Sequence, residues 1–76
     1  MSKALDLDHI FTHHPPTPSK IGNYIALREA AKSFAVVVCA HTPDCADRAA
    51  AIRHIREAVM TANAAVALDG RLHKTD

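Results

Sequence analysis

Hydrophobic side chains recur every three or four positions between residues 19 and about 40, which is the spacing of one face of an α-helix. They are Ile21, Tyr24, Leu27, Ala31, Phe34, Ala35 and Val38. Thr17 and Pro18 precede the pattern and suit a helix start, because the hydroxyl can accept from a free backbone N–H and proline lacks only a dispensable donor. The run Val36–Cys39 alone resembles a strand, but it continues the helical spacing without a break. We therefore predict one long helix over this segment.

A second helical pattern extends to about Leu68. Its inward positions are Ile52, Ile55, Val59, Ala62 and Val66. Thr42 and Pro43 repeat the pair that precedes the first helix, so we expect the second helix to begin there. The nearby acidic residues Asp44 and Asp47 favour the positive N-terminal end of a helix. Gly70 can adopt the left-handed conformation that ends many helices, and the end is expected at Asp69-Gly70.

The two ends of the chain lack helical spacing. Prolines at positions 15, 16 and 18 hold their neighbours extended, so residues 1–18 are predicted to form an extended N-terminal arm. Residues 19–69 then make up the domain, and residues 70–76 a frayed tail. Joined by a short turn, the two helices form an antiparallel two-helix hairpin, and the fold class is all-α.

The hairpin carries more apolar surface than its single seam can bury. In the first helix the apolar arc includes Leu27 and Phe34 on one side, and Ile21, Ile25 and Cys39 on the other. Hydrophobic residues make up 49% of the chain, yet two Phe, one Tyr and no Trp supply little bulk for an independent core. We therefore expect the chain to assemble into a homo-oligomer.

Length and charge exclude several classes of protein. The 76 residues suffice for one small domain and not for a two-domain enzyme. Nine Lys and Arg against eight Asp and Glu give a net charge of +1, too little for a protein that coats DNA or RNA. No segment has the apolar character of a signal peptide or a membrane span. We expect a cytoplasmic protein with neither a membrane nor a nucleic-acid polymer as partner.

Candidate binding residues follow one flank of the first helix. Tyr24, Arg28 and Lys32 lie at four-residue steps. Arg28 falls at the edge of the apolar arc, where a guanidinium without an anion is costly. The anion could be Glu57 or an acidic residue of a neighbouring subunit, which would make Arg28 structural. Alternatively it could be a ligand phosphate or carboxylate, with Tyr24 stacking on a base and Lys32 adding a second charge.

The second helix has polar residues beside its inward stripe. Arg56 and Asn63 lie two turns apart at its border. Asn63 could cap a backbone group, pair with its equivalent across a symmetry axis, or bind a base edge or ribose hydroxyl. Thr61 lies on the more polar side, where side chains are ordinarily solvated.

Metal binding and catalysis are not expected. Two groups of possible ligands are incomplete: His9, His13 and His14 in the arm, and Cys39, His41 and Cys45 around the turn. In a reducing compartment the two cysteines remain free thiols. No Ser or Cys has a sequence-encoded base, and no glycine-rich phosphate loop occurs. We therefore expect no cofactor and no enzymatic activity.

Several segments together resemble the helical-hairpin domain of phage cyclic-nucleotide sponges, the anti-CBASS and anti-Thoeris decoy proteins. The segments are His13–Pro18, Tyr24, Leu27–Ala35, Pro43 and Glu57–Ala65. The resemblance covers residues 11–68, and the last segment, which contains Asn63, is the most specific.

The resemblance implies a homo-oligomer, typically a hexamer, that sequesters cyclic dinucleotides and cyclic trinucleotides without cleaving them. Such a protein acts in the cytoplasm of the host cell and blocks its defence there. It implies pockets between subunits, one kind at a two-subunit interface and another around a threefold axis. Arg28 and Asn63 match positions for phosphate and for base or ribose recognition, and the threefold pocket is their expected place. The full set of candidate ligand-binding residues is Arg28, Asn63, Tyr24, Lys32, Thr61 and Arg56.

Thr61 stands where many relatives carry a bulkier aromatic residue, so the stacking surface for a base is either lost or supplied by Phe11 or Tyr24, and the choice of ligand would change with it. The principal alternative is a structural helical hairpin that mediates oligomerisation and binds no nucleotide. An enzyme that opens cyclic nucleotides through His13 or His14 would differ from both by releasing product.

Overall fold

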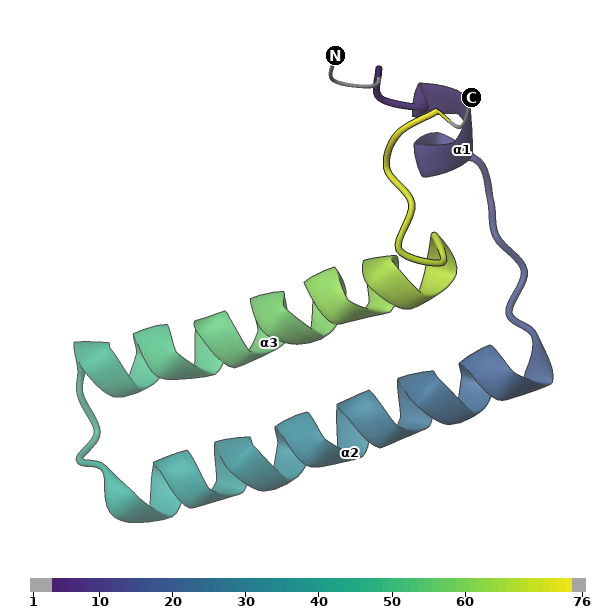
Figure 1. Cartoon of the computed structure of the whole chain (residues 1–76). Helices are drawn as coiled ribbons and strands as arrows, with labels where there is room; N and C mark the ends of the chain where they lie inside the picture. The colour runs from purple at the N-terminus through teal and green to yellow at the C-terminus, as the bar shows by residue number, and fades with distance from the viewer. Residues whose placement is uncertain (1–3, 75–76) are drawn as a thin grey trace.

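The computed structural model describes residues 4–74, which form three helices: α1 (Leu7–Phe11), α2 (Pro18–His41) and α3 (Ala46–Ala67). α2 and α3 lie side by side and antiparallel, and α1 lies beyond the open end of this hairpin, near both termini (Figure 1). The predicted helical hairpin is thus confirmed. Within the described residues, no helix is long and apolar enough to cross a membrane.

The start of α2 follows the sequence prediction. Pro18 is its first residue, and the Lys20 backbone N–H donates to Thr17 Oγ1 at 3.3 Å. The helix ends at His41, and the hydroxyl of the following Thr42 donates to the Val38 carbonyl oxygen at 2.6 Å. Thr42 therefore belongs to the end of α2.

The predicted start of α3 is wrong. The helix begins at Ala46, with Cys45 as its N-cap residue and no side-chain hydrogen bond at that cap. Thr42 does not cap α3 because it lies four residues before the first helical residue, Ala46. Asp44 instead supports the first turn of α3 through an ion pair in which Arg48 Nη2 lies 2.9 Å from Asp44 Oδ1.

The end of α3 lies close to the predicted Asp69-Gly70 and is a Schellman motif, but its first left-handed residue is Asp69, one position before the predicted Gly70. The Gly70 N–H donates to the Ala65 carbonyl at 2.9 Å, and the Asp69 N–H donates to the Val66 carbonyl at 3.3 Å. Both Asp69 (φ 53°) and Gly70 (φ 73°) adopt the left-handed conformation. The chain therefore leaves α3 at a fixed angle and turns towards α1.

The chain ends differ from the extended arm and frayed tail that the sequence predicts. Ala4–Asp6 pairs with Leu72–Lys74, an arrangement we call the terminal clasp. Its backbone hydrogen bonds run from Asp6 N–H to the Leu72 oxygen and from Lys74 N–H to the Ala4 oxygen, both at 2.9 Å. The arm is also partly helical, because Asp6 caps α1 by accepting from the His9 N–H at 3.1 Å. Residues 1–3 and 75–76 of the predicted arm and tail lie outside the described residues.

The terminal clasp is reinforced by an ion pair and a histidine. Arg71 Nη1 donates to Asp6 Oδ2 at 2.8 Å, and His9 Nε2 donates to the Leu68 carbonyl oxygen at 3.1 Å. The Arg71 guanidinium, followed by the His9 backbone N–H, holds the pKa of the Asp6 carboxyl below its usual value. The clasp thus joins α1 to the end of α3.

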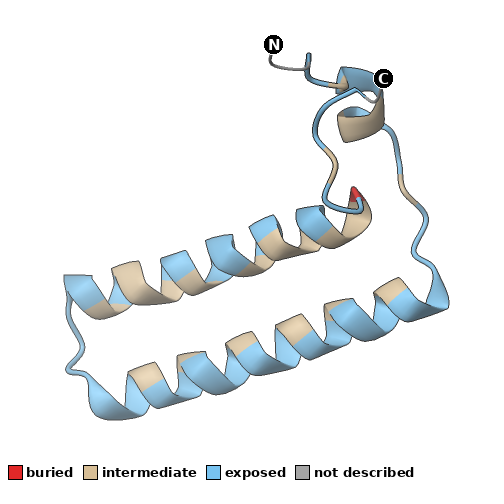
Figure 2. Cartoon of the chain, in the orientation of Figure 1, coloured by how far each residue is buried: buried red, intermediate tan, exposed pale blue. Residues whose placement is uncertain are grey.

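A single chain has almost no core. Both predicted inward stripes are mostly half-buried along the seam, and among the described residues Leu68 alone is buried, at 8% exposed (Figure 2). The accessible surface of 5906 Å² exceeds by roughly 1,400 Å² the value of about 4,500 Å² expected for a compact monomer of 8.2 kDa. The Cα radius of gyration of 16.1 Å likewise exceeds the expected value of about 11 Å. The isolated hairpin is therefore an open structure.

Candidate functional site

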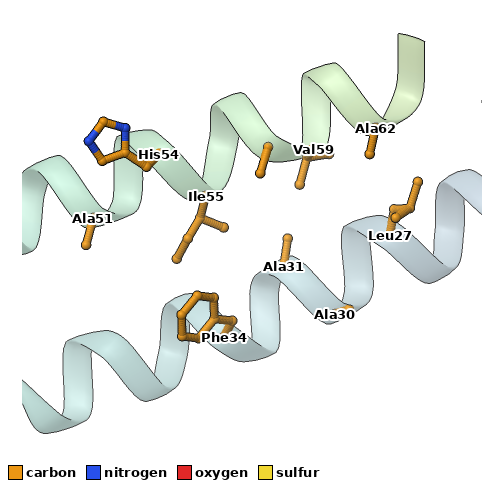
Figure 3. Close-up of a pocket in the computed structure, with 10 residues that line it drawn as sticks. Leu27, Ala30, Ala31, Phe34, Ala51, His54, Ile55, Val59 and Ala62 are labelled. Atoms are coloured by element: carbon orange, nitrogen blue, oxygen red, sulfur yellow. The ribbon is translucent and has the colours of Figure 1, made fainter. Parts of the chain in front are cut away.

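The seam between α2 and α3 separates two grooves of different character. The larger, which we call the apolar groove, has a volume of about 680 Å³. Its lining is Leu27, Ala30, Ala31, Phe34, Ala51, His54, Ile55, Ala58, Val59 and Ala62. Phe34 and Ile55 extend into the space between the helices, whereas His54 lies at the rim (Figure 3). Apart from this imidazole, the groove offers only hydrocarbon to a partner.

The second groove, which we call the cationic groove, carries two positive charges. It has a volume of about 280 Å³ and is lined by Ala31, Lys32, Ala35, Ile52, Ile55, Arg56, Val59 and Met60. Lys32 comes from α2 and Arg56 from α3, so the two helices each bring one cation to the same space. Within residues 4–74 neither cation makes an ion pair. The groove is therefore open to an anion.

Two further candidates lie on the same side of the seam. Lys20 Nζ is 3.4 Å from the Ala67 carbonyl oxygen, which shows that these two residues lie level with each other at the open end of the hairpin. Towards that end, Arg28 lies one turn beyond Lys32, and Asn63 two turns beyond Arg56. Residues at these spacings share a helix face. Arg28, Lys32, Arg56 and Asn63 therefore form one surface, which we call the cationic flank.

The structural reading of Arg28 as the partner of Glu57 is wrong for the single chain. Arg28 is exposed, and it makes no ion pair with any described residue. The Glu57 carboxylate is occupied elsewhere: Oε1 lies 3.7 Å from Arg53 Nε and Oε2 lies 3.4 Å from His54 Nδ1. Arg28 stays in water because its long side chain reaches past the apolar edge that its Cα occupies.

Asn63 has an acceptor without a donor. Its Oδ1 atom is buried and receives no hydrogen bond from the described part of the chain. The register places Asn63 level with Tyr24, which is also half-buried. An unsatisfied buried carbonyl oxygen costs about 1–3 kcal/mol, so a donor from outside the chain would be favourable here.

Thr61 is not brought to the cationic flank. It is exposed and lines a separate hollow of about 220 Å³ beside the end of α3, together with Ala64, Ala65, Leu68, Gly70, Arg71 and Leu72. Five of the six candidates, Tyr24, Arg28, Lys32, Arg56 and Asn63, lie along or beside the cationic flank, and Thr61 lies apart from them.

Of the other titratable residues, two histidines make contacts within the chain and two cysteines are free thiols. His9 and His14 form an edge-to-face pair with ring centroids 4.9 Å apart, and His14 Nε2 donates to the His9 carbonyl oxygen at 2.6 Å. Cys39 and Cys45 are exposed free thiols. Among residues 4–74 no three His, Cys, Asp or Glu side chains gather in a way that could hold a metal ion.

The opposition of Lys32 and Arg56 in one groove is the feature that sequence patterns missed. Each residue was recognisable on its own helix, but their meeting depends on the register between helices. That register is seen in contacts such as Lys20 with Ala67, which join residues 47 positions apart. No local spacing encodes them.

The fold and the two grooves define the chain as a small helical-hairpin protein with an uncovered apolar side and a cationic side. The chain belongs to the Acb2/Tad1 hairpin-domain family, whose model matches residues 3–67. The family resemblance inferred from the sequence is thereby confirmed. No curated protein and no solved structure matches the chain significantly.

Proposed function

We propose that this protein is a phage sponge that sequesters cyclic oligonucleotide signals, cyclic dinucleotides or cyclic trinucleotides, and so blocks a CBASS-like defence in the cytoplasm of the host. Membership of the Acb2/Tad1 hairpin family supports this class of function. The observation that carries the proposal is the cationic flank, where Arg28, Lys32 and Arg56 lack carboxylate partners among the described residues.

The chemistry of the flank fits such ligands. A cyclic oligonucleotide presents phosphodiesters of one negative charge each, joined to bases with flat apolar faces. Guanidinium and ammonium groups donate charge-assisted hydrogen bonds to phosphate oxygens. The Asn63 Oδ1 atom could accept from a base amino group or a ribose hydroxyl. Tyr24 supplies a ring for stacking.

The functional unit is proposed to be a homo-oligomer, with a hexamer as the expected form. A stable interface typically buries about 800 Å² on each partner, and the open hairpin exposes roughly 1,400 Å² more than a compact monomer of its size. Second copies would also repeat the Arg28 and Asn63 contacts by symmetry around one ring-shaped ligand.

Binding is proposed to occur without turnover. The test is to incubate the protein with cyclic di-AMP, cyclic di-GMP and cyclic tri-AMP, denature it, and identify the released nucleotide by mass spectrometry. We expect intact ligand in proportion to protein. Linear product would identify an enzyme instead, and the absence of any bound nucleotide would favour a purely structural oligomerisation module.

A further inference from the structure

We propose that Lys32 and Arg56 of one chain bind the same phosphodiester, which thereby bridges α2 and α3 across the cationic groove. The proposal rests on the proposed function and assigns one of its phosphate sites to a single chain. Both cations come from the same hairpin, so this phosphate site needs no second chain.

The cationic groove brings a cation from each helix to one space. Lys32 and Arg56 line one hollow of about 280 Å³ from opposite helices, and Ala31 and Ala35 line the same hollow. Because alanine side chains are small, this part of the lining leaves room for a phosphate in the groove. The planar guanidinium can donate two parallel hydrogen bonds to one phosphate, and the ammonium adds a third donor from the other side.

The two cations of the groove lack ion-pair partners among the described residues. Among the described residues, Glu57, which follows Arg56 in the chain, is engaged with Arg53 and His54, and no carboxylate pairs with Lys32 or Arg56. Glu29, three residues before Lys32, makes no ion pair with it. Two neighbouring cations over an apolar floor repel each other, and a shared anion removes that repulsion.

Most of the residues that line the groove are apolar. Ile52, Val59 and the exposed Met60 (60%) also line the groove. A base joined to the bound phosphate could cover this hydrocarbon. Inorganic phosphate could not, so a nucleotide should bind far more tightly than the bare ion.

The experiment is calorimetric titration of cyclic di-AMP, cyclic di-GMP and cyclic tri-AMP into the wild type, Lys32→Gln, Arg56→Gln and the double variant. Arg53→Gln is the matched control, because it removes the same charge from the same helix but its guanidinium pairs with Glu57. We expect each groove variant to weaken the tightest ligand at least tenfold and the control to stay within twofold. Because one phosphate serves both cations, the double variant should bind at most about threefold more weakly than the weaker single variant.

A charge-retaining variant shows whether the loss of charge or a change in packing weakens binding. Lys32→Arg should keep the affinity within about threefold of wild type, and an affinity as low as that of Lys32→Gln would overturn the proposal. Wild-type affinity in both glutamine variants, or a double variant weakened by the product of the single effects, would overturn the shared phosphate while leaving the proposed function standing. A wild type that binds no cyclic nucleotide would overturn both.

Discussion

At the scale of single residues, the two glycines of the chain have opposite requirements. Gly70 has a φ of 73° in the Schellman motif, whereas Gly22 lies within α2 with open space where a Cβ would be. We predict that Gly70→Ala lowers the free energy of unfolding by about 1 kcal/mol, because the left-handed conformation strains a Cβ. Gly22→Ala should raise it by about 0.5–1 kcal/mol. Urea unfolding at one protein concentration measures both, and equal shifts would contradict the assignment.

Asp6 gives the chain a pH dependence of known sign. Its folded-state pKa lies below the usual value because Arg71 and the His9 N–H stabilise the carboxylate. The stabilisation is therefore complete above the ordinary aspartate pKa of about 3.9 and is lost as the pH falls through the lower folded-state pKa. Asp6→Asn should melt below wild type at pH 7, and the difference should shrink towards pH 3. A difference that does not depend on pH would contradict this ion pair.

At the scale of helices, the two long elements differ in how they start. Thr17 caps α2 with its hydroxyl, whereas Cys45 occupies the same position of α3 in extended conformation and makes no side-chain cap. We predict that Thr17→Ala costs about 1 kcal/mol of stability and that Cys45→Ser adds about 0.5 kcal/mol by supplying a hydroxyl acceptor. Cys45→Ala is the control for loss of the thiol. Thermal melts should rank serine above alanine at position 45; the reverse order would contradict the capping assignment.

The two long helices, except for the start of α3, were predictable because local information determines them, whereas α1 was not predicted. The spacing of Leu27, Ala31 and Val38 defines α2, and α3 ends at Ala67, close to the predicted end at Asp69-Gly70. The start of α3 was not predictable, because the same threonine-proline pair can follow one helix or precede another. The terminal clasp also escaped prediction, since Asp6 and Arg71 are 65 positions apart and neither lies in a periodic segment. The cationic groove depends on inter-helix register in the same way.

At the scale of the molecule, the apolar groove is the surface that most needs a cover. Phe34 lines it at 59% exposed, while Val36, at 60% exposed, lines neither groove. If second copies cover the groove, Phe34→Asp should raise the dissociation constant of the oligomer more than tenfold, because a desolvated carboxylate would face hydrocarbon. Val36→Asp is the matched control. Sedimentation over a range of concentrations measures both, and equal effects would place the contact elsewhere.

The most direct test of the sponge proposal is native mass spectrometry of the wild-type protein, before and after mixing with a panel of cyclic di-, tri- and tetranucleotides. It reports the number of subunits and the mass of any bound ligand together. We predict an oligomer, with six subunits as the expected number, that gains whole, uncleaved nucleotides in fixed stoichiometry. An oligomer whose mass stays the same across the entire panel would contradict the proposed function. The alternative would then be a structural hairpin that mediates oligomerisation and binds no nucleotide.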